Sequence, residues 1–313
     1  MPVADLSKVA SQGFSWAPKK PVAPGEAPPI SVATPAAQTA TQAITDMFAP
    51  SVKTADDAVN IGMQNAQAVL AQGCDADKAV VQATLAGVAR LQKLQPPALK
   101  PGETPTPGNF NAPAAAAALR ACFQTVAAGT GGAIGAALAN AGLRALLQKD
   151  INITIPQACV TGLTYAHALK EMPGTTAAEQ TVGTAALGAY NAVFKLDDNG
   201  RACAKVLRSA LAAASGASSV PVGMSLARAA VSAMYDEDIP IKADEACEIG
   251  LNYTYAIRDT ATDPTEKANA EATIKAYDAA QPGPHSAYDC ATILGQYLKN
   301  EAGLGGLDAA HKA

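Results

Sequence analysis

The sequence is short of aromatic and charged residues. Aromatic side chains make up 4% of the 313 residues and charged side chains 16%, and Trp16 is the single tryptophan. Aromatic and β-branched residues favour strands, so their scarcity leaves little material for a β-sheet. About 73 alanines favour helices instead, because alanine loses no side-chain entropy in a helix. The composition therefore predicts an all-α fold.

Basic residues are not in excess either. The net charge is −4 and the pI about 5.4, so we expect no basic face that binds nucleic acid. Long, strongly apolar runs are also missing. The most apolar stretch, 121–147, is mostly Ala and Gly and contains Arg144, which favours packed helices over a membrane span. The N-terminus lacks the basic-then-apolar pattern of a signal peptide.

Proline and glycine divide the chain into six segments. Proline fixes φ and removes a backbone donor, so clustered prolines exclude a helix. Between 114 and 302 the Pro/Gly-rich breaks predict eight or nine helices. The expected segments are an extended Pro-rich arm (1–38), a helical segment (39–95), a Pro/Gly linker (96–113), two helical modules (114–198 and 199–284), and a C-terminal helix and tail (285–313).

An internal repeat links the two modules. Residues 149–170 align with 237–258 without a gap. Identical pairs in this alignment include Asp150/Asp238, Cys159/Cys247, Gly162/Gly250, Leu163/Leu251 and Tyr165/Tyr253. Outside it, Arg120-Ala-Cys122 is matched with Arg201-Ala-Cys203, and Cys290 falls where a third copy would begin. The sequence therefore predicts a duplicated helical module with extended Pro-rich arms.

Six cysteines recur along this pattern, at 74, 122, 159, 203, 247 and 290, with separations of 48, 37, 44, 44 and 43 residues. A metal site usually takes closely spaced ligand pairs, which are absent, and the only histidines are His167, His285 and His311. Three interpretations stay open. The thiols form disulfides, they are small buried core residues, or each carries a covalent group, since a thiolate forms a stable thioether with an activated vinyl group.

Charged residues near the cysteines suit a large acidic, nitrogen-bearing ligand. A guanidinium can clamp a carboxylate, and a carboxylate can accept hydrogen bonds from several N–H groups of a tetrapyrrole. The candidates are Arg120 and Arg201, each two residues before a cysteine, and Asp77, Asp244 and Asp289, close to Cys74, Cys247 and Cys290. Each carboxylate also has a plainer interpretation as a helix-start residue favoured by the macrodipole.

This pattern of an Ala-rich helical chain, a duplicated module and one isolated cysteine per helical pair resembles the γ subunits of red-algal phycoerythrin. The Asp150–Tyr165 and Asp238–Tyr253 segments carry the likeness, together with Arg-Ala-Cys at Cys122 and Cys203. The resemblance implies a light-harvesting linker with phycourobilin and phycoerythrobilin bound covalently to cysteines. We therefore expect pigment on Cys122, Cys159, Cys203, Cys247 and Cys290, with Cys74 ranked last and at least one thiol free.

The resemblance also implies partners and a location. Such subunits sit in the central cavity of hexamers of phycoerythrin α and β subunits, contact other rod linkers and help assemble phycobilisome rods. The expected location is the chloroplast, at the stromal face of the thylakoid membrane and peripheral to it.

No enzyme signature emerges from the residues. The glycine-rich stretch 129–135 matches neither the dinucleotide-binding nor the phosphate-loop spacing, and a hydrolytic Cys–His pair needs one reactive cysteine, not six alike. We therefore expect a non-enzyme. The alternative is a secreted helical binding or structural protein in which the six cysteines form disulfides.

Overall fold

The computed structural model describes residues 33–96, 102, 108–129, 132–148, 150–196, 200–216, 220–235, 238–283 and 285–304. These residues form helices and no strand, which confirms the all-α prediction. Most of the expected arm 1–38 lies outside the described residues, as does the tail after 304. Met1–Thr34 and Pro35–Ala313 are separate units. The helices are α2 (Pro35–Met47), α3 (Ala55–Gln72), α4 (Asp75–Leu91), α5 (Ala112–Ala128), α6 (Ile134–Leu147), α7 (Ile155–Glu171), α8 (Ala177–Val193), α9 (Gly200–Gly216), α10 (Val222–Tyr235), α11 (Ala243–Thr260), α12 (Pro264–Ala280) and α13 (Ser286–Glu301).

Side-chain caps explain where several helices begin. The first amides of a helix lack an internal partner, and a side chain three residues further on can accept from the cap residue. The Glu179 carboxylate accepts from the amide of Thr176 at 2.7 Å, before α8, and Glu245 accepts from Lys242 at 2.8 Å, before α11. Gln157 accepts from Thr154 at 2.7 Å in the same way before α7. The predicted helical segment 39–95 contains three helices, because the chain breaks after α2 and α3.

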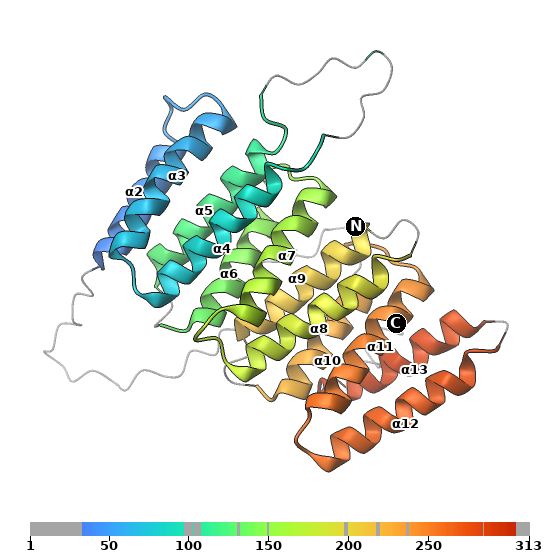
Figure 1. The fold of residues 1–313 in the computed structure, drawn as a ribbon. Helices are drawn as coiled ribbons and strands as arrows, with labels where there is room; N and C mark the ends of the chain where they lie inside the picture. Colours follow the sequence, from blue (N-terminus) through green and yellow to red (C-terminus); the bar gives the residue numbers. More distant parts are fainter. Residues whose placement is uncertain are drawn as a thin grey trace, which may run out of the picture. The chain divides into compact units, whose positions relative to one another are not determined.

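The helices of Pro35–Ala313 are arranged in two layers (Figure 1). Each helix contacts its neighbours within its layer and one or more helices of the other. Hairpins alternate between the layers, so that the chain passes from one layer to the other after every second helix. The order of neighbours in the first layer is α2, α5, α6, α9, α10, α13, and in the second layer α3, α4, α7, α8, α11, α12.

This alternation gives the stack two different edges. We call the edge where the chain changes layer the crossing edge; it holds the connections α2–α3, α4–α5, α6–α7, α8–α9, α10–α11 and α12–α13. The opposite edge, the hairpin edge, holds the connections within a layer. Hydrogen bonds tie the crossing edge together: the Asn111 side chain donates to the Leu94 carbonyl at 3.0 Å, and the amide of Asn109 donates to Asp56 at 3.2 Å.

Glycine lets the two layers approach closely at equivalent points. A Cβ on Gly162 of α7 would lie 2.7 Å from the Leu207 Cβ of α9. A Cβ on Gly250 of α11 would lie 2.9 Å from the Leu294 Cβ of α13. Both distances are shorter than a carbon–carbon contact allows, so these helices meet only because the glycines have no side chain.

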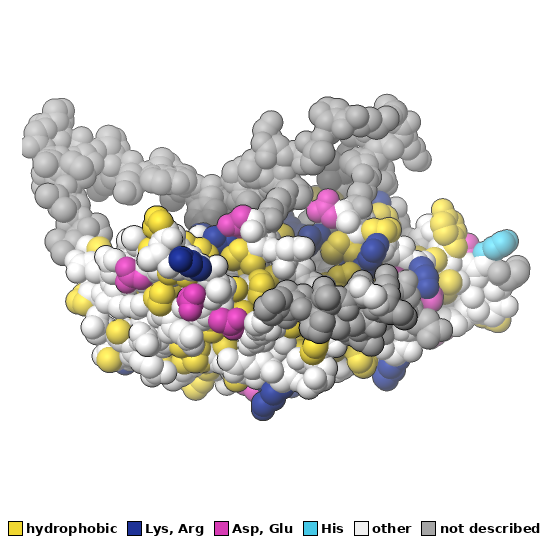
Figure 2. Space-filling view, turned by 90° about the horizontal axis from the view of Figure 1, so that it is seen from above, with side chains coloured by type: hydrophobic (Ala, Val, Ile, Leu, Met, Phe, Trp, Pro, Cys, Tyr) yellow, Lys and Arg dark blue, Asp and Glu magenta, His cyan; other side chains and the backbone are white. Residues whose placement is uncertain are grey.

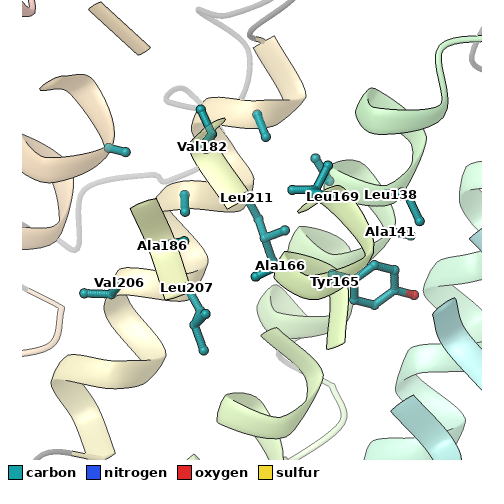
Figure 3. Packing of buried hydrophobic residues seen from close by; sticks show 14 of the residues in the cluster. Leu138, Ala141, Tyr165, Ala166, Leu169, Val182, Ala186, Val206, Leu207 and Leu211 are labelled. Carbon is teal, nitrogen blue, oxygen red and sulfur yellow. The ribbon is translucent and has the colours of Figure 1, made fainter. Parts of the chain in front are cut away.

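The core between the layers consists largely of alanine with single large side chains between them. Tyr165 is 1% exposed, and its hydroxyl lies 2.6 Å from the Thr84 Oγ1 of α4. Tyr253 occupies the matching place in α11 and is fully buried, but its hydroxyl has no hydrogen-bond partner among the described residues. Figure 3 shows part of this core, formed by Leu138, Ala141, Tyr165, Ala166, Leu169, Val182, Ala186, Val206, Leu207 and Leu211.

The Gly162 contact predicts a stability loss. Gly162→Ala forces α7 away from Leu207, and we expect it to lower the free energy of unfolding by roughly 1–3 kcal/mol. Gly216→Ala is the matched control, because nothing lies within 4 Å of a Cβ there and alanine suits a helix better. Urea unfolding measures both. Equal stabilities for the two variants would contradict the close contact.

The two buried tyrosines predict opposite effects of the same change. Tyr165→Phe removes the hydrogen bond to Thr84 and should lower the free energy of unfolding by about 1 kcal/mol. Tyr253→Phe removes a buried hydroxyl without a partner, so stability should stay the same or rise. Thermal unfolding followed by circular dichroism compares them, and a larger loss for Tyr253→Phe would refute this difference.

Candidate functional site

Four of the six cysteines lie at the crossing edge. Cys159, Cys203, Cys247 and Cys290 occupy the fourth or fifth residue of α7, α9, α11 and α13. The first turns of α7 and α9 lie side by side, as do those of α11 and α13, because these helices contact each other across the layers. The four thiols therefore belong to two neighbouring places on one edge.

Each of these thiols donates a hydrogen bond to a backbone carbonyl of a neighbouring helix. Cys159 donates to Gly200 at 3.4 Å, and Cys247 donates to Ala287 at 2.6 Å. Cys203 lies 3.9 Å from the Tyr190 carbonyl and Cys290 lies 3.7 Å from that of Tyr277. Cys247 follows Cys159 by 88 residues and Cys290 follows Cys203 by 87, and in both cases the acceptor residue follows by 87. The same arrangement thus occurs twice.

Burial makes these thiols weak acids. Cys203, Cys247 and Cys290 are at most 5% exposed, while Cys159 is half-buried. Desolvation raises the pKa of Cys159 to about 11 and those of Cys203 and Cys247 to about 12. Burial also raises the pKa of Cys290, while the neighbouring Cys247 side chain acts in the opposite direction. At neutral pH all four are protonated thiols, which are poor nucleophiles.

Cys122 is separate from the other five cysteines. It lies in the middle of α5, is 0% exposed and packs in the core beside Thr84 and Tyr165. Desolvation raises its pKa to about 12, against which a hydrogen bond with Thr84 acts. Cys122 is the eleventh residue of its helix, whereas Cys203 is the fourth residue of α9.

Cys74 is exposed and lies at the hairpin edge, at the N-cap of α4. Its amide donates to the Asp77 carboxylate at 3.1 Å. Asp77 therefore caps the helix in this structure, in agreement with the plainer of its two interpretations. Cys74, the last-ranked candidate for pigment attachment in the sequence analysis, is the most accessible of the six thiols.

Arg120 makes a two-pronged contact with Asp150, at 2.6 and 2.7 Å, and lies 4.8 Å from the centre of the Phe48 ring. The guanidinium lowers the pKa of Asp150. Arg208 forms the corresponding ion pair with Asp238 at 3.8 Å, 88 residues further on. The structural counterpart of Arg120 is therefore Arg208, which corrects the sequence-based match between Arg120 and Arg201.

The remaining charged candidates are exposed at the crossing edge. Arg201 lies in the first turn of α9, two residues from Cys203. Asp244 and Asp289 lie in the first turns of α11 and α13. Their negative charges contribute to the raised pKa values of Cys247 and Cys290, after the larger effect of burial. All three therefore lie near thiols, whose own hydrogen bonds go to backbone carbonyls.

The sequence reasoning missed a strip of exposed apolar side chains. Each one is at a helix end on the crossing edge, and all but Phe48 are on or beside the helices that carry the repeated cysteines. In this strip the rings of Tyr190 and Phe194 stack with centroids 5.6 Å apart. Its members are Phe48, Leu147, Ile155, Phe194, Tyr235 and Tyr288, exposed by 38–71%. Large side chains directly before predicted breaks were the signal that could have revealed it.

A hollow of about 430 Å³ lies at the start of this strip, between the α2–α3 turn, the start of α5 and residues 150–152. Phe48, Val52 and Ile151 give it apolar walls, and Lys53 and Asp150 give it one charge of each sign. On the face seen in Figure 2, charges of both signs are interspersed and hydrophobic side chains emerge in several separate places.

In the described part of the chain, histidine and other potential metal ligands do not gather into a further site. His167 lies 3.3 Å from Glu171 on an exposed helix face. No group of three or more potential metal ligands occurs among the described residues. None of the described helices is both long and apolar enough to cross a bilayer.

Comparison with known proteins gives no relative: no family model, curated protein or solved structure matches the chain. Functional inference therefore rests on the residues and their geometry.

Thiol exposure predicts three rates of reaction with the disulfide reagent DTNB at pH 8. In the folded chain without pigment we expect Cys74 to react fast, Cys159 slowly, and the four buried thiols more slowly still, at rates that unfolding in guanidinium raises, because the thiolate is the nucleophile. Cys74→Ser should abolish the fast phase and Cys122→Ser should leave it intact. Fast labelling of Cys122 or Cys203 would be inconsistent with this burial.

Proposed function

We propose that this chain is a light-harvesting linker subunit that carries phycourobilin and phycoerythrobilin as thioethers on its cysteines. The observation that carries the proposal is the alignment of four regularly repeated thiols along one edge, beside the exposed aromatic and aliphatic strip. The resemblance to phycoerythrin γ subunits supplies the chemistry of the pigment. An edge with thiols beneath exposed apolar side chains suits a planar, largely apolar group that is tethered at one end.

We further infer that the helical module is duplicated. Two repeated contacts support this. The ion pair Arg120–Asp150 recurs as Arg208–Asp238, and the Gly162–Leu207 contact recurs as Gly250–Leu294. A repeat of about 88 residues distributes equivalent attachment places along the stack, so that absorbed energy passes between pigments.

Burial sets the order of attachment in this proposal. Cys74 and Cys159 accept pigment on the folded chain, because their sulfur atoms are accessible. Cys122, Cys203, Cys247 and Cys290 are buried, so pigment reaches them before the helices pack. The pigment then occupies the space between the first turns of the paired helices and holds them slightly apart.

Charged residues orient the pigments. Arg201 is exposed beside Cys203 and binds a propionate, whereas Arg120 is held by Asp150 and must leave it to do so. Asp244 and Asp289 accept pyrrole N–H groups from pigments on Cys247 and Cys290. Asp77 already accepts from the amide of Cys74 through one carboxylate oxygen, which leaves the other oxygen to accept from a pigment on Cys74. Held in this way, a bilin loses less excitation through torsion.

The proposed partners follow from the same resemblance. The chain sits in the central cavity of hexamers of phycoerythrin α and β subunits, docks on neighbouring discs through its Pro-rich arms and contacts other rod linkers. Its place is the phycobilisome at the stromal face of the thylakoid in the chloroplast, peripheral to the membrane. It binds no nucleic acid and has no catalytic role.

A second candidate is a secreted helical binding or structural protein linked by disulfides. The position of Cys247 favours it, because its thiol donates to the Ala287 carbonyl, one helical turn before Cys290. Reduction would then change the mobility of the chain on a denaturing gel, whereas thioether pigments survive reduction.

Single-cysteine variants of the pigment-loaded chain test the proposed function. Cys159→Ala and Cys247→Ala should each remove the absorbance of one pigment and its coloured tryptic peptide, with little loss of stability. Val59→Ala is the matched control, because Val59 is the fifth residue of α3, as Cys159 is the fifth residue of α7. This variant should leave the colour unchanged. A variant that unfolds but keeps its full colour would overturn the assignment of that cysteine.

A further inference from the structure

The four crossing-edge cysteines are arranged as two pairs. In each pair the first thiol donates to a carbonyl three residues before the second cysteine: Cys159 to Gly200, ahead of Cys203, and Cys247 to Ala287, ahead of Cys290. Three residues are about one turn of a helix, so each first thiol lies at the turn that carries its partner.

The partners within a pair also act directly on each other. Cys247 and Cys290 lie close enough for each to influence the pKa of the other. The charge of a Cys159 thiolate raises the pKa of Cys203, and both cysteines raise the pKa of the nearby Tyr190. Cys74 and Cys122 take part in neither pair: Cys74 is at the opposite edge and Cys122 is beside Thr84.

The helices α3 and α5 repeat the arrangement without thiols at the paired positions. Gly62 of α3 contacts Leu119 of α5, as Gly162 contacts Leu207, with a Cβ-to-carbon distance of 2.9 Å. This contact aligns α3 with α7 and α5 with α9. In that alignment Val59 occupies the position of Cys159, and Ala115 occupies the position of Cys203. In each of the three copies, therefore, the two paired positions are either both cysteine or both another residue. Isolated core cysteines have no physical reason to occur together in this way, whereas sulfur atoms that react with each other do.

We propose that Cys159–Cys203 and Cys247–Cys290 are two dithiol pairs, each of which closes to a disulfide when the pigment-free chain meets a disulfide oxidant such as oxidised glutathione. Cys74 belongs to neither pair, so its exposed thiol goes no further than a glutathione adduct, and the buried Cys122 stays reduced. The proposal goes beyond the pigment-carrying role and does not depend on it, because it concerns the chain with all thiols free. A thioether on either sulfur removes that pair from the reaction.

The reaction balances as two thiol–disulfide exchanges. A protein thiol loses its proton, and the thiolate attacks one sulfur of oxidised glutathione, whose S–S bond breaks and releases one glutathione. The second protein thiol then loses its proton, attacks the mixed disulfide and releases the second glutathione. Each pair gives up two electrons and two protons, and one oxidised glutathione becomes two reduced molecules.

Accessibility sets the order of closure. Cys159 is half-buried and starts the reaction of the first pair. Cys247 and Cys290 are both buried, so the second pair reacts only when the first turns of α11 and α13 open. We therefore expect the Cys159–Cys203 bond to form first.

Peptide mapping of the full chain expressed without pigment tests the pairs. The folded chain is incubated with oxidised glutathione, alkylated and digested with trypsin without reduction. Because every cysteine falls in its own tryptic peptide, the connectivity can be read directly. We expect peptide 150–170 joined to 202–205 and peptide 243–258 joined to 276–299, with a mass loss of about 2 Da per bond.

Two variants keep the test specific, with helical circular dichroism as the check that each one folds. Cys203→Ser should leave a glutathione adduct on Cys159 and the second bond intact. Cys122→Ser should leave both bonds intact. Links between the two pairs, adducts on Cys159 in the wild-type chain at equilibrium, or unchanged thiols would each overturn the proposal. Pigment content plays no part in these readings, so their failure is distinct from a failure of the proposed function.

Discussion

The close approach of a glycine in one layer to a leucine in the other governs the arrangement of this chain. Gly162 against Leu207 and Gly250 against Leu294 bring α7 onto α9 and α11 onto α13 at distances that no larger residue permits. Alanine fills most of the surrounding core, so the layers stay close along the whole stack. The first turns of the paired helices consequently meet at the crossing edge, with their thiols side by side.

Much of the fold was predictable from the sequence, because alanine content and proline breaks act locally. The alignment of the two copies was predictable only where both contain the same residues other than alanine. In α5 the run of alanines before Arg120 contains no such residue, so the Arg-Ala-Cys triplet that Arg120 and Arg201 share suggested the wrong alignment. The Arg120–Asp150 ion pair corresponds to the Arg208–Asp238 ion pair, which gives the correct alignment. The copy in the first helices escaped notice because Val59 replaces the cysteine and the long connection after α4 breaks the spacing.

The positions of the candidate site residues were predictable, but their surroundings were not. Regular spacing of cysteines says which helices carry them and nothing about burial, which depends on how neighbouring helices cross. The structure therefore separates buried Cys122 from exposed Cys74 and groups the other four, although all six look alike in the sequence. A pigment-bearing role and a dithiol role both use this grouping, because each requires sulfur atoms that are held in a fixed place by rigid helices.

The central claim is that covalent pigments occupy these thiols, and the visible spectrum of the chain purified from its natural source tests it most directly. The protein is reduced, denatured in acidic urea and then run on a zinc-stained denaturing gel. A covalent bilin keeps its visible absorption through reduction and unfolding and gives a fluorescent band with zinc. A colourless, non-fluorescent chain would contradict the pigment-carrying account and leave a helical scaffold with paired thiols.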